Sequence, residues 1–218
     1  MSEREEKARL RAEMKRVLAG IDEPSAAARS RELCDRLLGS DLLGGGPVMV
    51  FAPIPGEVDL GPLAEALVAS GRAVCLPRID WKTKSMAPAL VTSIDRERGG
   101  LVVRRHDVPE PSTSAPIVEV GSLSCVLVPG LAFDREGGRL GRGAGFYDRF
   151  VQRCREGATG PGGTHGPIAV GVCFDEQLID RVPTEGHDLM LDAVATPTKI
   201  RRRSGGLSPQ PPKGDTED

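Results

Sequence analysis

Several features are missing from this sequence of 218 residues, and each absence narrows the class of protein. It contains no run of 18 or more apolar residues, so we expect no segment that spans a membrane. The first 15 residues are densely charged and lack the apolar stretch of a secretory signal. The formal net charge is only -2, so no strong overall field draws the chain to nucleic acid or to anionic lipid. We therefore expect a cytoplasmic protein that binds neither, in which any anion site is built locally.

The five cysteines include no pair at CxxC spacing. Cys75, Cys125 and Cys173 lie within apolar runs that are typical of strands. A free cysteine packs as a small hydrophobic side chain, so we interpret these residues as reduced thiols of the core. A zinc site or a catalytic thiol is the alternative.

The amino-terminal region predicts two helices, over residues 3–19 and 25–38, because apolar residues recur there at helical spacing. Lys7, Arg11 and Lys15 follow one another at four-residue steps and so form one cationic stripe on the first helix. The stripe could bind an anion, or it could be an ordinary solvated helix face.

Beyond residue 46 the period changes to short continuous apolar runs, which are typical of strands buried on both faces. Such runs occupy residues 47–52, 73–77, 122–128 and 168–174. Helices are predicted near 61–70 and from Phe146 onward. This alternation predicts an α/β fold of three layers, in which helices flank a mostly parallel sheet.

We assign residues 1–200 to a single α/β domain. Residues 157–166 contain five glycines, which indicates a flexible surface insertion. Residues 201–218 have little hydrophobic content and predict a disordered carboxyl-terminal tail.

Residues 127–150, LVPGLAFDREGGRLGRGAGFYDRF, carry the most chemical information. A buried strand enters a glycine-rich loop, and a helix follows. Glycines let a backbone approach a ligand, and the amides of a helix amino terminus point at anions, so this pattern favours phosphate binding. Arg139 and Arg142 add charges that suit phosphate oxygens, and Asp148 in the first helical turn could bind a metal ion. The loop matches neither the P-loop nor the dinucleotide fingerprint, and a plain surface loop is the alternative.

Acidic residues follow two of the predicted strands. Glu57 lies just past the first strand, and Asp188 lies in the segment 182–192 after the last one. The carboxyl ends of parallel strands are where α/β folds place ligand contacts. Taken alone, Glu57 could simply be an acid at a helix amino terminus, Asp188 and Asp192 could be solvated surface acids, and His187 could cap or pack.

The glycine-arginine segment resembles the signature of the 5-formyltetrahydrofolate cyclo-ligase family: proline-glycine, phenylalanine-aspartate, arginine-leucine-glycine-x-glycine-x-glycine, two aromatics and aspartate. Other pieces fall in the family's order. They are the basic helix at Lys7–Arg11, Phe51 to Glu57, Leu76-Pro77-Arg78, Phe174 to Gln177, and His187-Asp188 with Leu191-Asp192. The resemblance covers roughly residues 5–200.

The resemblance implies a fold similar to the sugar-phosphate isomerase and CoA-transferase group. It implies a ligase of folate and one-carbon metabolism that uses ATP and Mg²⁺ to convert 5-formyltetrahydrofolate, with or without a polyglutamate tail, into 5,10-methenyltetrahydrofolate. The reaction releases ADP and phosphate, and its intermediate is a phosphorylated formyl group, an imidate phosphate. We expect a monomer.

The resemblance also implies the site residues. Those for ATP are Lys7, Arg11, Arg139, Leu140, Gly141, Arg142, Gly143, Ala144, Gly145, Phe146 and Tyr147. Those for the folate are Ala52, Glu57, Arg142, Gly143, Ala144, Gly145 and Phe146. Arg142 and Tyr147 are the catalytic candidates, and Asp148 and Asp188 are the magnesium ligands, with Glu185 and Asp192 as nearby substitutes.

Two departures from the family pattern stand in the loop. Ala144 occupies a position where some members carry lysine, and Phe146 replaces a frequent tyrosine. Two rival functions remain: a relative that binds ATP or folate without ring closure, and an enzyme of the same fold group that needs no ATP.

Overall fold

The computed structural model describes residues 2–96, 98–99, 101–103, 108–157, 166–186 and 188–206. Its centre is a seven-stranded sheet in the order β11-β10-β9-β6-β1-β2-β3. The strands are β1 (Val48–Met49), β2 (Val74–Asp80), β3 (Ser85–Val91), β6 (Cys125–Val128), β9 (Ile168–Val172), β10 (Ala193–Ala195) and β11 (Ile200–Arg202). The inner strands from β10 to β2 pair in parallel, and only the edge strands β3 and β11 are antiparallel.

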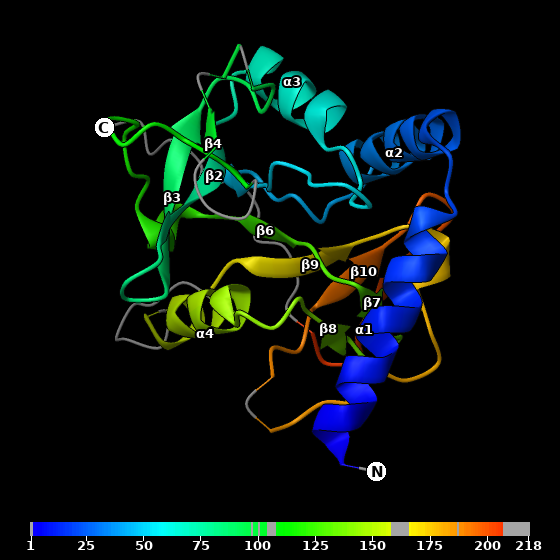
Figure 1. Cartoon of the computed structure of the whole chain (residues 1–218). Helices are drawn as coiled ribbons and strands as arrows, with labels where there is room; N and C mark the ends of the chain where they lie inside the picture. Colours follow the sequence, from blue (N-terminus) through cyan, green and yellow to red (C-terminus); the bar gives the residue numbers. More distant parts are fainter. Residues whose placement is uncertain are drawn as a thin grey trace.

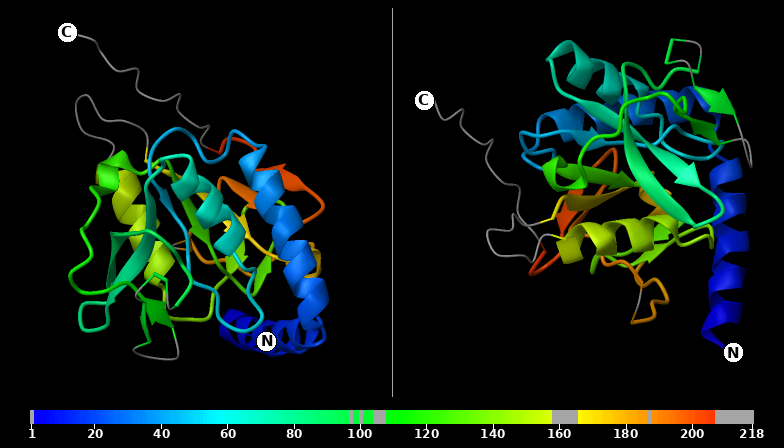
Figure 2. Two further views of the ribbon diagram at one scale, coloured as in Figure 1. Left: turned by 90° about the horizontal axis from the view of Figure 1, so that it is seen from above. Right: turned by 90° about the vertical axis from the view of Figure 1, so that its left-hand side faces the viewer.

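Helices cover both faces of this sheet (Figures 1 and 2). They are α1 (Glu3–Ala19), α2 (Glu23–Leu38), α3 (Gly61–Ala69) and α4 (Phe146–Gly157). In Figure 1, α2 and α3 lie above the sheet and α4 lies below it. Alternate residues of β6 join different clusters, because Cys125 and Leu127 pack on the α2 side whereas Val126 and Val128 pack on the α4 side. The predicted three-layer α/β architecture is thus confirmed.

Two smaller antiparallel pairs complete the fold: β4 (Val102–Val103) with β5 (Pro109–Glu110), and β7 (Ala132–Phe133) with β8 (Arg139–Leu140). Two short 3₁₀ helices, η1 (Val120–Ser122) and η2 (Asp175–Gln177), connect elements. None of the described helices is long and apolar enough to cross a membrane.

The amino-terminal helix begins as its sequence predicts. Ser2 caps α1, since its hydroxyl accepts from the Glu5 amide while the Glu5 carboxylate accepts from the Ser2 amide. The second helix begins two residues earlier than predicted, because Asp22 caps it and its carboxylate accepts from the Ser25 amide.

The predicted boundary of the tail is wrong for its first residues. β11 pairs with β10, Arg202 pairs with Asp41, and Arg203 donates from Nε to the Leu191 carbonyl at 3.0 Å. Backbone pairing and arginine contacts therefore place 201–206 in the folded unit despite their polar composition. Residues 207–218 of the predicted tail, and 158–165 of the predicted insertion, lie outside the described residues.

Candidate active site

The glycine-rich segment forms a hairpin and then a loop that leads into α4. The buried Asp134 organises the hairpin turn, because its Oδ1 accepts from the amides of Glu136 (2.9 Å) and Gly138 (2.8 Å). Its Oδ2 accepts from the Val182 amide at 2.9 Å, which ties the turn to the segment that carries Asp188. Sequence reasoning missed this role of Asp134, although an aspartate shortly before two glycines is a turn signal.

The loop 141–145 has the backbone that its glycines predict. Gly143 has φ +107° and Gly145 has φ +66°, values that residues with a Cβ rarely adopt. A Cβ at Gly143 would meet nothing within 4 Å, whereas one at Gly145 would lie 2.7 Å from Arg149 Nη1. Gly143 and Ala144 are exposed, and the Ala144 carbonyl accepts from Arg149 Nη2 at 2.8 Å. The open side of the loop is therefore at Gly143.

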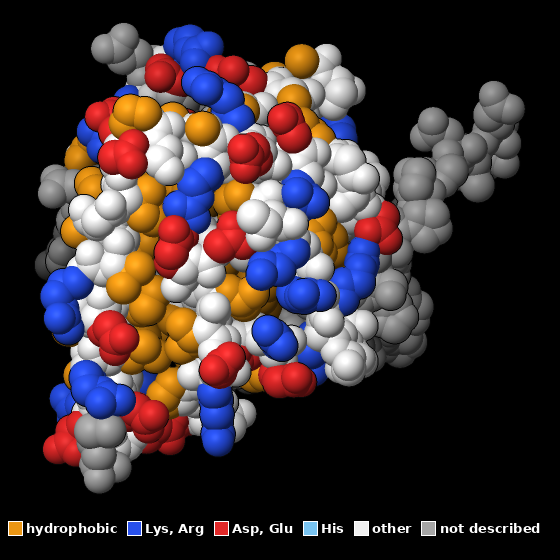
Figure 3. All heavy atoms as spheres, turned by 90° about the vertical axis from the view of Figure 1, so that its right-hand side faces the viewer, with side chains coloured by type: hydrophobic (Ala, Val, Ile, Leu, Met, Phe, Trp, Pro, Cys, Tyr) orange, Lys and Arg blue, Asp and Glu red, His pale blue; other side chains and the backbone are white. Residues whose placement is uncertain are grey.

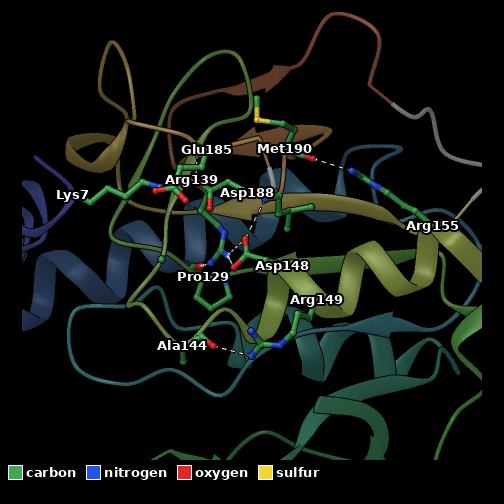
Figure 4. A network of polar contacts seen from close by, with 12 residues as sticks. Lys7, Pro129, Arg139, Ala144, Asp148, Arg149, Arg155, Glu185, Asp188 and Met190 are labelled. Carbon is green, nitrogen blue, oxygen red and sulfur yellow. Dashed lines mark hydrogen bonds and ion pairs between the residues drawn. The ribbon is translucent and has the colours of Figure 1, made fainter. Parts of the chain in front are cut away.

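The two residues before this loop face the protein. Leu140 is 1% exposed, and its carbonyl accepts from the Leu131 amide at 2.8 Å. The Arg139 side chain is 6% exposed, and its Nη2 lies 2.8 Å from both carboxylate oxygens of Asp148 (Figure 4). Its Nη1 donates to the Pro129 carbonyl at 3.1 Å. The structure thus joins one predicted ATP ligand to one predicted metal ligand.

Arg142 leaves the strand and pairs with Glu57. Its Nε donates to Glu57 Oε1 at 3.1 Å, and the Ile54 amide donates to Glu57 Oε2 at 3.3 Å. The Glu57 side chain is 8% exposed, whereas that of Arg142 is 36% exposed. Burial raises the pKa of Glu57, although Arg142 and the Ile54 amide offset part of that effect. Glu57 is therefore a buried acceptor with one half-exposed cationic partner.

The first helix brings two cations to the same place. Arg11 Nε donates to the Gly141 carbonyl at 3.0 Å. Lys7 Nζ lies 2.8 Å from Asp188 Oδ2, 3.2 Å from Glu3 and 3.6 Å from Glu185 (Figure 4). Burial lowers the pKa of Lys7, but its hydrogen bonds to Asp188 and Glu3, together with the charges of Asp188 and Glu185, outweigh burial and raise it.

Seen from the side on which α1 lies, the surface mixes basic and acidic side chains with hydrophobic ones (Figure 3). This agrees with the near-neutral net charge, and it means that anion attraction on this face depends on local geometry. Lys15, the third member of the predicted stripe, is exposed.

Aromatic residues at the start of α4 connect the loop to the β2–β3 hairpin. The Phe146 ring meets Trp81 edge-on, with centroids 5.1 Å apart. Trp81 lines a cavity of about 520 Å³, and its Nε1 donates to the buried Glu110 at 3.0 Å. Burial raises the pKa of Tyr147, and the Arg139 guanidinium lies 6.0 Å from its ring. The Tyr147 hydroxyl is therefore protonated at neutral pH and can act as a hydrogen-bond donor.

Ala52, the remaining predicted folate contact, is buried at the end of the segment that follows β1. It lines a second cavity, of about 410 Å³, together with Asp59 and Ile94.

The two predicted metal ligands come from segments 40 positions apart and reach one region. The Leu189 amide, next to Asp188 in the chain, donates to Asp148 Oδ1 at 3.2 Å. Arg155 Nη1 donates to the Met190 carbonyl at 3.1 Å, which fastens this segment to α4 (Figure 4). Within the described ranges, no three His, Cys, Asp or Glu residues cluster as a metal site. His187 lies outside those ranges.

Asp192 is not the solvated acid that its chemistry alone suggested. It is 2% exposed, and its Oδ2 accepts from Arg155 and from the Ala169 amide, at 2.8 and 2.9 Å. These contacts hold it in the fold, which leaves it unsuited to replace a metal ligand. Gln177 is a second buried polar residue that sequence reasoning did not assign; its Nε2 donates to the Gly130 carbonyl at 2.8 Å.

The five cysteines are buried and free, as predicted for core thiols. Burial raises the pKa of Cys34 and Cys154 to about 11 and that of Cys75 to about 12. Such thiols are protonated at neutral pH, which argues against nucleophilic catalysis by cysteine.

Comparison with known proteins finds relatives across kingdoms. The chain is 34% identical over 154 residues to the 5-formyltetrahydrofolate cyclo-ligase of Escherichia coli (strain K12), covering 70% of this chain and 79% of the relative. It is 31% identical to the enzyme of that name from Saccharomyces cerevisiae, covering 85% and 92%. Among solved structures, the 5,10-methenyltetrahydrofolate synthetase of Aquifex aeolicus matches with a TM-score of 0.73 and 26% identity, covering 96% of this chain and 98% of that one.

The model of the 5-formyltetrahydrofolate cyclo-ligase family matches residues 3–197, a range that includes α1, the glycine loop and the segment around Asp188. The resemblance seen in the loop thus extends over nearly all of the folded residues. The chain belongs to the 5-formyltetrahydrofolate cyclo-ligase family, and it is an enzyme of that family.

Proposed function

We propose that the enzyme converts 5-formyltetrahydrofolate to 5,10-methenyltetrahydrofolate at the expense of ATP, which leaves as ADP and phosphate. The observation that carries this proposal is the convergence of three distant segments on the glycine loop. Arg11 contacts Gly141, Glu57 contacts Arg142, and the segment of Asp188 contacts Asp148 through Leu189. Cations that can bind a triphosphate thus lie around one loop, together with a carboxylate that can accept from pterin N–H groups.

The formyl group on nitrogen 5 is an amide and a poor electrophile. In the proposed reaction the formyl oxygen attacks the γ-phosphorus of ATP, and the bond to ADP breaks. The resulting imidate phosphate has a phosphate leaving group on the formyl carbon. Nitrogen 10 then attacks this carbon, the carbon–oxygen bond breaks, and phosphate departs with the proton of nitrogen 10. No covalent enzyme nucleophile is needed, so the protein acts through positioning and charge.

Residues of this chain supply both the positioning and the charge. Loop amides near the open Gly143 and the cations Lys7, Arg11 and Arg142 stabilise charge on the transferring group. Arg142 is half-exposed, so it can turn from Glu57 toward phosphate when the pterin takes up the Glu57 carboxylate. Tyr147 keeps its proton and can donate a hydrogen bond.

Magnesium fits the donor chemistry here, since it takes one or two protein carboxylates and fills its other positions with water and phosphate oxygens. Asp148 and Asp188 would hold it, and the bound ion would neutralise charge on the phosphates. Both carboxylates carry a cationic neighbour, Arg139 and Lys7, which offsets their charge near a triphosphate.

We further propose a cytoplasmic monomer that binds neither nucleic acid nor membrane and accepts folate with or without a polyglutamate tail. The likeness of the fold to the sugar-phosphate isomerase and CoA-transferase group also stays a prediction.

The test is to follow the absorbance of 5,10-methenyltetrahydrofolate formed from 5-formyltetrahydrofolate, with and without ATP and Mg²⁺. We expect product only when both are present, with phosphate released in equal amount. Product without ATP would support an ATP-independent enzyme instead. ATP binding without product would indicate a relative that has lost ring closure.

A further inference from the structure

Arg139 is enclosed by the protein on nearly every side. Its side chain is 6% exposed, and both terminal nitrogens have protein acceptors, the Pro129 carbonyl and the Asp148 carboxylate. Its Nε is buried and has no hydrogen-bond partner within the described residues. The guanidinium therefore has little surface left from which to contact a bound phosphate.

Two glycines of the segment, Gly130 and Gly141, lie beside Arg139, where a larger residue would strike it or its neighbours. A Cβ at Gly141 would lie 3.0 Å from Arg139 Nη1, and one at Gly130 would lie 3.1 Å from its Cγ and 2.7 Å from Phe133 Cζ. Gly143 differs, since a Cβ there would meet nothing within 4 Å. Of these three glycines, Gly141 makes room for Arg139, Gly130 makes room for Phe133 and Arg139, and Gly143 opens outward.

Asp148 is the group that Arg139 holds. One nitrogen of the guanidinium straddles both carboxylate oxygens at 2.8 Å, and the Leu189 amide donates to one of them at 3.2 Å. Arg139 is itself fixed by its place in β8, where it pairs with Phe133 of β7. The carboxylate is therefore oriented by the β7–β8 hairpin and not only by its own helix.

We propose that Arg139 is a positioning residue for Asp148 and not a ligand of the ATP phosphates. This assignment rests on the proposed function, in which Asp148 serves the magnesium ion. Arg139 fixes the direction of the carboxylate and offsets its charge, while Arg142, three residues on, supplies the phosphate contact.

The experiment compares Arg139→Lys with its matched control Arg142→Lys. ATP binding is measured by calorimetry in EDTA and again with Mg²⁺. We expect Arg142→Lys to weaken binding in EDTA about tenfold, as loss of one charge-assisted contact does, and Arg139→Lys to change it less than about twofold. Arg139→Lys should instead reduce the gain in ATP affinity that Mg²⁺ brings by about tenfold. The double variant with Arg139→Lys and Asp148→Asn should lose no more of the Mg²⁺-dependent gain in ATP affinity than Asp148→Asn alone loses.

The proposal is overturned if Arg139→Lys weakens binding in EDTA as much as Arg142→Lys does, or if its effect adds to that of Asp148→Asn. A second measurement does not depend on the variant folding: in the wild-type protein, the NMR signal of the Arg139 Nε–H group should keep its chemical shift when ATP is added in EDTA, while that of Arg142 moves. A shift of both signals would also overturn it. If the wild-type protein binds no ATP with or without Mg²⁺, the proposed function fails first and removes the basis of this inference.

Discussion

Arg139 and Arg142 stand three residues apart in one glycine-rich segment, yet they lie in opposite environments. Arg139 belongs to β8, is 6% exposed in its side chain and pairs with Asp148. Arg142 lies past the strand, is 36% exposed and pairs with Glu57. A buried guanidinium with fixed partners is part of the scaffold, whereas a half-exposed one can exchange its partner for a ligand. Charge and spacing alone therefore do not tell which arginine of such a motif binds the substrate.

The strongest test of this difference changes Asp148, the carboxylate that Arg139 contacts. Asp148→Asn would leave the Arg139 charge buried with no carboxylate, which costs about 2–3 kcal/mol of unfolding free energy for a partly buried pair. Turnover should fall at least about a hundredfold, and excess Mg²⁺ should restore little of it. Urea unfolding and turnover against magnesium concentration measure the two effects.

Asp188→Asn serves as the control for that variant. Its partner Lys7 also lies near Glu3 and Glu185, so the cation keeps acidic neighbours, and both losses should be smaller and partly reversed by magnesium. If both variants keep near-normal turnover at limiting magnesium, the metal pair is wrong.

Arg142→Ala tests the exposed member of the comparison. We expect turnover to fall about a hundredfold, equivalent to about 2–4 kcal/mol of transition-state stabilisation, and the unfolding free energy to fall less than in Asp148→Asn, because the substituted side chain is itself partly solvated and Glu57 keeps the Ile54 amide as a donor. Steady-state kinetics and urea unfolding of the same preparation separate the two. A large loss of stability would place Arg142 with Arg139 as part of the scaffold.

Much of this arrangement could be predicted from the sequence, and the reasons are local. Continuous apolar runs identified β1, β2, β6 and β9, and the glycine pattern located a loop whose Gly143 and Gly145 have positive φ. β10 and β11 escaped prediction because neither lies in a long apolar run: β10 is a buried segment of three residues and β11 is rich in arginine. Such short strands are held by pairing with neighbours, which a local pattern does not reveal.

The pairing of charges escaped prediction for a similar reason. Lys7 lies 181 positions from Asp188, and Arg142 lies 85 positions from Glu57. The segments could be assigned to one edge of a parallel sheet, but which cation contacts which acid depends on side-chain directions set by the whole fold. Asp192 illustrates this, because its chemistry alone suggested a solvated surface acid, whereas the fold buries its side chain.

Glu57→Gln changes the partner of Arg142, and it tests the comparison through the pH dependence of stability. Burial raises the pKa of Glu57 above its usual 4.5, so the folded state holds this proton more tightly than the unfolded state does. The resulting stability is fully present below pH 4.5 and is lost as pH rises through the folded-state pKa. The glutamine variant should lose this part of the pH dependence, as measured by melting temperature between pH 4 and pH 8.

In kinetics, Glu57→Gln should impair use of the folate while ATP binding survives, because the neutral amide is a weaker acceptor for pterin N–H groups. Near-normal kinetics with modest instability would instead indicate that Glu57 serves the local backbone alone, through the Ile54 amide.

A smaller effect is expected at the edge of the loop, from Arg11→Ala. Arg11 contacts the Gly141 carbonyl, between the two arginines, and should bind ATP from outside the loop. The variant should raise the KM for ATP by roughly threefold to tenfold and that for folate less. Lys15→Ala, on the same helix face but exposed, is the matched control and should change neither. Equal effects of the two variants would indicate a general surface charge effect.

The smallest effect is expected from truncation after Gly206, and it concerns the scaffold that holds Arg139. Removing 207–218 should leave turnover unchanged and alter the unfolding free energy by less than about 0.5 kcal/mol, because those residues have little hydrophobic content.

Truncation after Lys199 should behave differently. It removes β11 and the Arg203 contact to the Leu191 carbonyl, and the Leu191 amide in turn donates to Gly137 in the turn before β8. We expect a loss of about 1–3 kcal/mol and a weakened response to magnesium, with metal-free ATP binding retained in the protein that remains folded. Equal effects of the two truncations would show that the last strand does not support the buried side of the loop.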